Sequence, residues 1–98
     1  MPLTSKQARQ LRGLAHPLQP VVQVGDKGVT QAVINKVDTE LENHELIKVK
    51  IAADRDEVKA AAIALCQATG AELAGSVGKV VMLYRRRKEG EPTIQLEK

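Results

Sequence analysis

The chain has 98 residues, of which 43% are hydrophobic and 28% are charged. This is the length of one domain and the composition of a globular protein, so both a second folded unit and a disordered chain are excluded. Tyr84 is the only aromatic residue, which excludes recognition of a partner by a platform of stacked rings. Fifteen basic and twelve acidic residues give a net charge of +3, a mild indication of a polyanionic partner.

The charges are distributed unevenly along the chain. Residues 1–27 carry four basic side chains and one acid, and residues 79–88 carry five basic side chains and no acid. Residues 38–57 carry seven acids and three basic side chains. We therefore expect one surface that attracts polyanions and another that repels them.

Cysteine usage and hydropathy indicate the compartment. Cys66 is the only cysteine, so no intramolecular disulfide can form, and a single thiol in an apolar run suits a reducing compartment. No apolar stretch approaches the ~20 residues that a membrane span requires. The first residues also lack the apolar stretch of a signal peptide. We expect a cytoplasmic protein without membrane contact.

A helix is predicted over residues 5–15, because Thr4 and Gln7 form a capping box and Pro17 follows the end of the helix. At helical spacing its apolar residues share one side, and the opposite side carries Lys6, Arg9 and Arg12. A solvated outer face and a polyanion-binding face both fit this pattern. Binding is favoured, because three cations without an acid three or four residues away repel one another.

The next segments alternate between strand and helix patterns. Residues 21–24 form a β-rich run, and a loop over residues 25–28 separates it from apolar residues at helical spacing over residues 29–43. Within residues 46–51, Ile47, Val49 and Ile51 alternate with two polar residues, which predicts a strand with one wet face. That face carries Lys48 and Lys50.

Asp54 is expected to cap a third helix, whose alanine-rich run over residues 58–69 ends at Gly70. Residues 71–77 and 80–86 then flank a glycine-lysine pair, which predicts a β-hairpin. The resulting order is αβαβαββ. It predicts an α/β fold class with a single two-layer domain and a mixed four-stranded sheet.

The chain is predicted to be one domain over residues 1–98, with its core over about residues 3–86 and a C-terminal tail over residues 88–98. Within the tail, residues 93–96 fit either a small edge strand or a loose segment.

Gly25, Asp26, Lys27 and Gly28 stand between a predicted strand and a predicted helix. Glycines at such a place permit a positive φ and the close approach of a phosphate, and the free N–H groups of the first helical turn favour an anion. Lys27 adds a positive charge, whereas Asp26 opposes a generic phosphate pocket. A plain strand-to-helix turn is the alternative that these four residues leave open.

Four adjacent cations, Arg85, Arg86, Arg87 and Lys88, stand at the end of the last predicted strand. Cations beside a sheet edge can guard it against pairing with another chain. Four of them exceed what such protection requires, so contact with phosphates is the favoured interpretation.

The sequence offers no constellation for catalysis. It has two histidines and one cysteine, and its carboxylates do not cluster at catalytic or metal-binding spacing. Cys66 falls within a helix, where a buried, inert thiol is expected. His16 is expected to cap its helix and His44 to be structural. We therefore expect a protein that is not an enzyme and that takes no cofactor, metal or small-molecule substrate.

Short segments occur in a fixed order between residues 3 and 86: LRGLAHPL at 11–18, PVVQVG at 20–25, GVT at 28–30, HELIKVK at 44–50, GK at 78–79 and LYR at 83–85. Together they resemble the YhbY-type proteins, the stand-alone bacterial form of the CRM domain (chloroplast RNA splicing and ribosome maturation). The resemblance implies an RNA-binding domain whose fold is similar to the C-terminal domain of bacterial translation initiation factor three.

The resemblance also implies a partner and a contact site. Bacterial members associate with precursors of the large ribosomal subunit, and the G-x-x-G loop, here Gly25 to Gly28, is regarded as an RNA-contacting element by analogy with KH domains. Asp26 departs from the pattern, since many members carry a basic residue there.

We therefore predict a monomeric protein that binds ribosomal RNA or pre-ribosomal particles and assists assembly of the large subunit. Without aromatic rings, it is expected to hold RNA through phosphates and 2′-hydroxyls. The predicted contacts are Lys6, Arg9, Arg12, Gly25, Asp26, Lys27, Gly28, Lys48, Lys50, Arg85, Arg86, Arg87 and Lys88. The alternative is a factor that docks on ribosomal proteins through its acidic second helix and touches RNA only incidentally.

Overall fold

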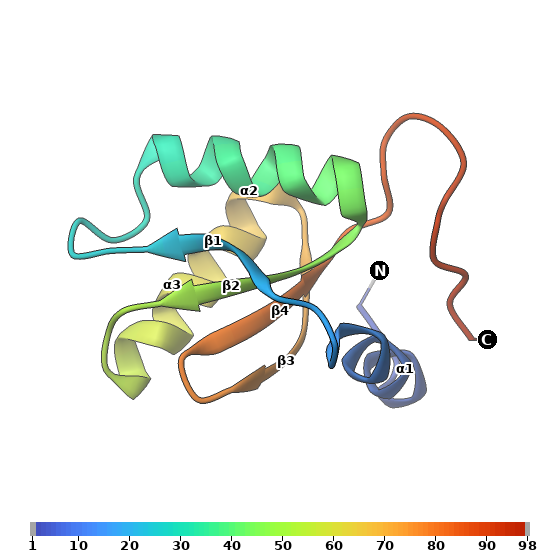
Figure 1. Cartoon of the computed structure of the whole chain (residues 1–98), viewed down its shortest axis with the longest axis horizontal. Coiled ribbons are helices and arrows are strands. Elements are labelled where there is room, and N and C mark those ends of the chain that lie inside the picture. The colour runs from blue at the N-terminus through green and yellow to red at the C-terminus, as the bar shows by residue number, and fades with distance from the viewer. Residues whose placement is uncertain (1, 98) are drawn as a thin grey trace.

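The computed structural model describes residues 2–97. Its elements are α1 (Ser5–Ala15), β1 (Pro20–Val24), α2 (Gln31–His44), β2 (Leu46–Ile51), α3 (Arg55–Thr69), β3 (Glu72–Val77) and β4 (Val80–Tyr84) (Figure 1). The order αβαβαββ and a mixed four-stranded sheet confirm the predicted fold class.

Local signals set the ends of the helices. The Thr4 side chain accepts a hydrogen bond from the Gln7 backbone N–H, so the predicted capping box is confirmed at the start of α1. Asp54 caps α3 in the same way, and Gly70 ends α3 with a positive φ of 79°. The start of α2 was predicted two residues too early, because Thr30 is its cap and accepts from the Val33 N–H.

The strands lie in the order β1-β2-β4-β3. β1 runs parallel to β2, and β4 is antiparallel to both β2 and β3. In this register Lys50 pairs with Gln23 on one side and with Val80 on the other. These three side chains therefore point to the same face of the sheet, because directly paired residues share a face.

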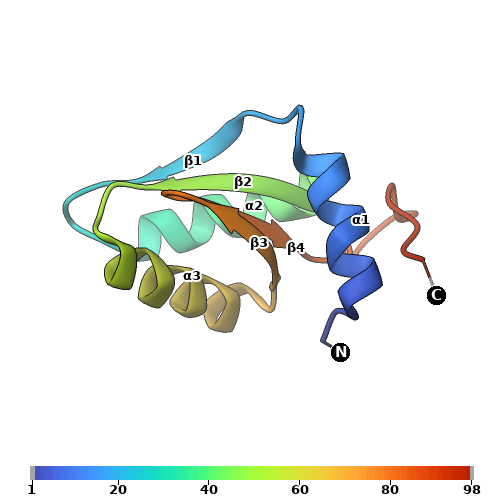
Figure 2. The ribbon, with the colours of Figure 1, turned by 90° about the horizontal axis from the view of Figure 1, so that it is seen from below.

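α2 and α3 lie side by side on the other face of the sheet, while α1 stands at one end, outside that layer (Figures 1 and 2). The main core lies between the sheet and these two helices, and its fully buried members include Val37, Leu41, Val49, Leu65 and Leu83. Burial of such aliphatic side chains contributes roughly 1.5–3 kcal/mol each and builds a core without aromatic rings.

α1 packs a second, smaller core against part of the opposite sheet face. Leu11 and Ala15 are fully buried there against Leu46, Met82 and Tyr84. α1 does not extend over the neighbouring part of this face, where Gln23 and Lys50 are exposed. This region, occupied by the side chains of Gln23, Lys50 and Val80, is called the open face below.

The tail is neither an edge strand nor loose. Residues 93–96 pair with no strand of the sheet, but Gln10 of α1 donates to the carbonyl of Gln95 (2.8 Å) and accepts from the backbone N–H of Glu97 (2.8 Å). Ile94 and Leu96 pack on the core beneath α1. The tail is thus fixed along α1 by the side chain of Gln10, which makes hydrogen bonds to backbone groups of the tail as a neighbouring strand would.

Within residues 2–97 no helix combines the length and the apolar character that crossing a bilayer requires.

Candidate RNA interface

The three cations of α1 differ in their surroundings. Arg9 is exposed, and Lys6 lies 4.0 Å from the carboxylate of Glu97 in the tail. Arg12 reaches across the sheet and donates to the carbonyl of Ala74 in β3 (3.0 Å). This contact fixes the guanidinium of Arg12 at the border of the open face.

Gly75 makes room for Arg12. A Cβ atom at this position would lie 2.6 Å from Arg12 Cδ and 2.9 Å from Arg12 Cγ, closer than van der Waals contact allows. The stem of the arginine therefore runs directly over the backbone of β3. The sequence does not reveal this requirement, because it depends on two elements that are 63 positions apart in the chain.

The G-x-x-G loop forms a tight turn at one end of the molecule. Gly28 has a φ of 71°, a conformation that favours glycine, and its N–H donates to the carbonyl of Gly25 (3.0 Å). Asp26 and Lys27 are exposed at the tip. The turn geometry is that expected of a backbone element able to approach a phosphate closely.

A groove of about 250 Å³ lies between this loop and the start of α3. Asp26 and Glu57 both line it, so it repels a phosphate. Positive charge at this end comes from Lys27 on the loop and from Lys79 in the turn between β3 and β4, both exposed. Lys79 was not among the predicted contacts, although it belongs to the cationic segment of the sequence.

Lys48 and Lys50 share a face of β2 but have different roles. Lys48 is partly buried, and its ammonium group donates to the carbonyls of His16 (3.2 Å) and Leu18 (3.1 Å) just after α1. It thereby satisfies carbonyl groups beyond the helix end, where positive charge is favourable. Lys50 is exposed on the open face. Because Lys48 contacts the end of α1 and shares its face of β2 with Lys50, the open face and α1 lie on the same side of the sheet.

The burial of Arg85 contradicts the prediction that this residue contacts RNA. It is only 8% exposed. Its guanidinium pairs with the carboxylates of Asp38 (2.5 Å) and Glu42 (3.4 Å) on α2 and donates to the carbonyl of Thr69 (2.9 Å). The hydrogen bond from Arg85 is the largest influence on Asp38 and holds the pKa of that carboxyl below its ordinary value. Arg85 is therefore a structural residue that ties β4 to α2.

The other three cations of this run lie beyond the end of β4, which was predicted to extend two residues further. Arg86 and Lys88 are exposed. Arg87 is partly buried and donates to the carbonyl of Asn43 at the end of α2 (2.9 Å). The backbone N–H of Lys88 donates to both carboxylate oxygens of Glu42, which is the largest influence lowering the pKa of Glu42.

The acidic part of α2 thus has an internal function that its sequence did not suggest. Asp38, Glu42 and Glu45 hold the segment after β4, and Glu45 is fully buried. These acids are partly neutralised within the fold. They offer less negative surface to a protein partner than the sequence indicates.

The predicted contacts do not form one continuous surface. Figure 1 places the loop of residues 25–28 at the left-hand end of the molecule and the segment after β4 at the right-hand end, beside the C-terminus of α2. The open face lies between them, and α1 stands toward the right-hand end (Figure 1). The structure therefore brings together Arg12, Lys48 and Lys50, with Lys27 and Lys79 at one border, and separates Arg86, Arg87 and Lys88 from them.

The cysteine, the tyrosine and His16 have structural surroundings. Burial raises the pKa of the half-buried Cys66 thiol, and Glu72 adds to the shift, so the thiol stays protonated and inert. Tyr84 is 7% exposed and packs in the smaller core. His16 caps α1, as predicted. Among residues 2–97 no group of three or more His, Cys, Asp or Glu side chains is placed to hold a metal ion.

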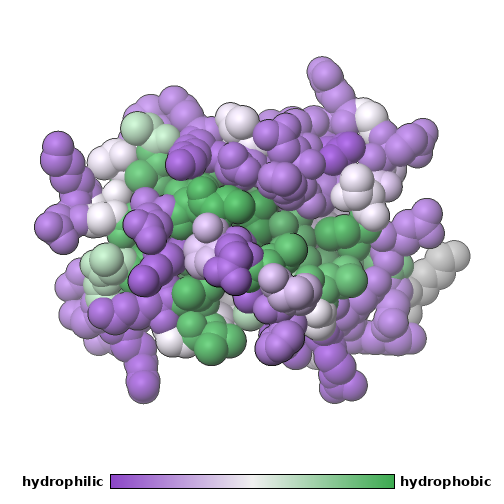
Figure 3. All heavy atoms as spheres, in the orientation of Figure 1, coloured by the Kyte–Doolittle hydropathy of each residue, from purple (hydrophilic) through white to green (hydrophobic). Residues whose placement is uncertain are grey.

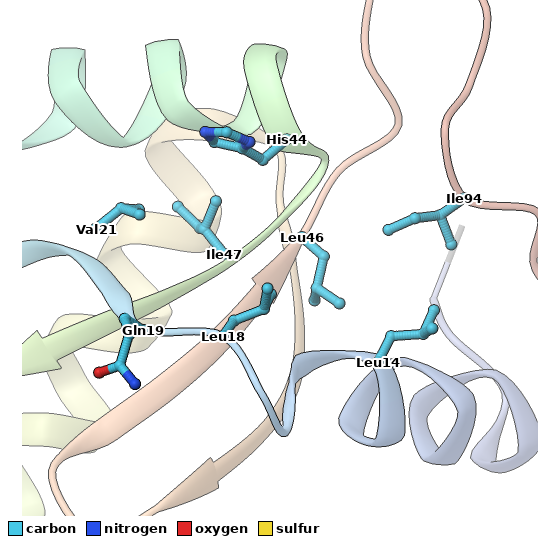
Figure 4. A pocket seen from close by; sticks show the side chains of 8 residues that line it. All are labelled: Leu14, Leu18, Gln19, Val21, His44, Leu46, Ile47 and Ile94. Carbon is cyan, nitrogen blue, oxygen red and sulfur yellow. The ribbon is translucent and has the colours of Figure 1, made fainter.

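Apolar side chains form a band across the face of the molecule that carries α1 and the open face (Figure 3). At one end of this band, Leu14, Leu18, Val21, Leu46 and Ile94 line a groove of about 420 Å³ together with His44. Figure 4 shows Leu14, Leu18, Leu46 and Ile94 around a common space between α1, β2 and the tail. Leu14 is 46% exposed. The sequence did not predict this groove, because it joins α1, β1, the end of α2 and the tail.

Fold and site together define a class: a two-layer α/β domain with a partly uncovered sheet, a glycine-rich turn, and exposed cations on the uncovered side and at its border. The sequence matches the CRS1 / YhbY (CRM) domain over residues 3–85, so the chain belongs to this family.

Similar proteins carry names that agree with this assignment. A protein of Pseudomonas aeruginosa named a probable RNA-binding protein is 39% identical over 87 residues, which cover 88% of this chain and 84% of that protein. A protein of Haemophilus influenzae named an RNA-binding protein is 40% identical over 90 residues, with 91% of each chain covered. The solution structure of a Staphylococcus aureus protein, described as hypothetical and as a candidate RNA binder, is 41% identical. It superposes with a TM-score of 0.84 over 97% of this chain and 99% of that one.

Proposed function

We propose that this protein binds ribosomal RNA or pre-ribosomal particles in the cytoplasm and assists assembly of the large ribosomal subunit. The observation that carries the proposal is the uncovered part of the sheet, whose exposed Lys50 lies near Arg12 and near the cationic turns that hold Lys27 and Lys79. Named RNA-binding relatives support RNA as the ligand. The role is one of binding by a monomer, without catalysis.

The expected mode of binding is electrostatic. About six exposed cations, drawn from α1, the G-x-x-G loop, the open face, the β3–β4 turn and Arg86, can neutralise phosphates. Arg85 is excluded because it is buried. The logarithm of the affinity should then fall against the logarithm of the salt concentration with a slope of about −4 to −5.

Charge reversal tests this proposal. The double variant Lys27→Glu and Lys50→Glu should weaken binding to large-subunit ribosomal RNA fragments and reduce the salt slope by about 2. The matched control reverses Lys36 and Lys59, which are equally exposed but lie in the layer of α2 and α3. A slope near zero, or equal losses in the two double variants, would show that the proposed surface is wrong.

The assembly role needs a separate measurement. Cosedimentation with cell extracts should place the protein with precursors of the large subunit and not with mature subunits or small-subunit particles. An even distribution over all particles would leave an RNA-binding protein without a role in large-subunit assembly.

The apolar groove of Figure 4 favours a second candidate function, docking on a protein. Exposed Leu14 and Leu18 in this groove lie beside His44, which pairs with Glu40 of α2 (3.3 Å). These surroundings suit a protein segment that inserts one apolar side chain. Leu14→Asp would then abolish association with pre-ribosomal particles and leave binding to protein-free RNA unchanged. The reverse pattern would assign association to the RNA surface alone.

A further inference from the structure

A second groove, of about 420 Å³, lies on the sheet beside the C-terminal half of α1. Val77, Val80 and Met82 provide its apolar lining, and Leu18 borders it where the chain leaves α1. Val77 is 69% exposed, the largest value among the exposed large hydrophobic residues of the described chain. The volume lies within the ~300–1,000 Å³ range of sites that take small organic groups.

Arg12 gives this apolar groove a planar cationic wall. Its guanidinium lines the groove and is held by the hydrogen bond to the Ala74 carbonyl. Gly75 lets the stem of Arg12 lie close to β3, so the group is positioned before any ligand arrives. A guanidinium plane is one of the surfaces on which unpaired RNA bases stack, alongside aromatic rings. A chain with one buried tyrosine therefore still has a place for a base.

The charges around the groove indicate what kind of ligand it takes. No acidic residue lines it, whereas Arg12 and Lys48 both do. The ammonium group of Lys48 donates to the carbonyls of His16 and Leu18, so it is less available to a ligand than the exposed Lys50, which is paired with Val80 in the sheet. Gln19 adds a neutral amide that can donate to and accept from a polar edge. These groups match the parts of a nucleotide. The apolar floor and the planar guanidinium suit the two flat faces of a base, the amide suits its polar edge, and the ammonium group beside the groove suits a phosphate.

We propose that this groove binds one unpaired nucleobase of RNA, with the base against Arg12 and Val77 and a neighbouring phosphate at Lys50. The proposal rests on the RNA-binding function and adds to it a preference for RNA with an unpaired nucleotide. Phosphate contacts at Lys27 and Lys79 position the RNA, and the groove distinguishes a bulged or single-stranded site from a continuous duplex.

Three hairpin RNAs serve as probes: one with a single bulged adenosine, the same hairpin with a ribose lacking its base at the bulge, and the fully paired hairpin. The wild-type protein should bind the bulged hairpin about tenfold more tightly than the abasic one, near the lower end of the roughly 5- to 150-fold that stacking of one base on an aromatic ring contributes. Affinity for the abasic and paired hairpins measures phosphate contact alone.

Two variants examine the groove without changing the net charge. Val77→Asn makes its floor polar, and Arg12→Lys keeps the charge but removes the plane. Both should reduce the tenfold preference to about twofold or less, while affinity for the abasic hairpin changes by less than about threefold. Ile63→Asn is the control, since Ile63 is 47% exposed on α3, in the layer on the other side of the sheet. It should retain the full preference.

The outcomes separate the two proposals. Binding of all three hairpins with equal affinity would overturn the base site and leave the phosphate-binding surface standing. A base preference that persists in both groove variants would also overturn it, because the base would then lie elsewhere. Failure to bind any of the hairpins or any large-subunit RNA fragment would overturn the proposed RNA-binding function itself.

Discussion

Replacement of Glu45 by glutamine should release the C-terminal tail. Glu45 is fully buried at the end of α2 and has a positive φ of 64°. Its carboxylate accepts hydrogen bonds from the backbone N–H groups of Arg87 (2.9 Å), Thr93 (2.5 Å) and Ile94 (3.0 Å), and from the Thr93 hydroxyl. One anion thus holds two points of a segment that otherwise lacks regular structure.

The size of the effect follows from the number of acceptors. Glutamine keeps one oxygen, so the amide nitrogen must face either the Arg87 N–H or the donors of Thr93 and Ile94. A buried donor left without an acceptor costs about 1–3 kcal/mol, and each remaining bond weakens as its acceptor loses its charge. Because the neutral side chain is also less costly to bury, we expect a net loss of about 2–3 kcal/mol from docking of the tail.

Hydrogen exchange measures this loss where it occurs. The amides of Arg87, Thr93 and Ile94 should exchange faster in Glu45→Gln, whereas the core amides of β2 should respond less, since the tail can open without global unfolding. Glu40→Gln is the matched control, because Glu40 is on the same helix and contacts His44 instead of the tail. Unchanged protection of the three amides in Glu45→Gln would refute the argument that the carboxylate holds the tail.

The pH dependence gives an independent check. Burial alone would raise the pKa of Glu45, but the hydrogen bonds from Thr93, Arg87 and Ile94 outweigh it and lower the pKa below its ordinary value of 4.5. The stabilisation is therefore complete above about pH 4.5 and is lost as the pH falls through the lower folded value. Protection of the tail amides should follow this course in the wild type and be weak at every pH in Glu45→Gln.

Two further predictions concern the arginines of the candidate interface. Gly75→Ala should displace Arg12, lower the stability by about 1–3 kcal/mol and weaken RNA binding, whereas Gly13→Ala, on the open side of α1, should raise the stability by up to about 1 kcal/mol and leave binding unchanged. Denaturant unfolding and RNA titration measure both effects, and equal behaviour of the two variants would contradict the prediction. Arg85→Gln should lower the free energy of unfolding by about 2–3 kcal/mol, less than the loss of a fully buried pair because one of its carboxylate partners is half exposed. It should not change the affinity of the folded protein for RNA, whereas Arg86→Gln, at an exposed position, should lower RNA affinity with little effect on unfolding. A loss of affinity confined to the Arg85 variant would contradict the structural role assigned to Arg85.

The fold could be predicted because its signals are local. The Thr4 and Asp54 caps, the Gly70 helix end and the alternation over residues 46–51 each act within a few residues, and all agree with the observed elements. The tail could not be predicted in the same way. Its position depends on Gln10 and on Glu45, which lie more than 40 residues away from their tail partners.

Arg85 shows how a site residue was misassigned by its neighbours in the sequence. It was grouped with the three cations that follow it, but its surroundings are set by the alternation of β4. Val81, Leu83 and Arg85 fall on the face covered by α2, where Asp38 and Glu42 are spaced by one helical turn. The strand predicted over residues 80–86 included Arg85, so its periodicity applied to this residue would have placed Arg85 on the same face as Val81 and Leu83.

The internal ion pairs also change the interpretation of the net charge. Arg85 neutralises part of the acidity of α2 within the fold, so neither contributes fully to the field outside. Exposed Lys50 lies in the centre of the side of the sheet that α1 only partly covers, with Lys27 at its border, whereas exposed Lys36 and Lys59 lie in the layer of α2 and α3 (Figure 2). In that layer, exposed Asp56 and Glu57 at the start of α3 repel a phosphate backbone. RNA is therefore expected to approach the open face, where the groove beside Arg12 can test whether a nucleotide is unpaired.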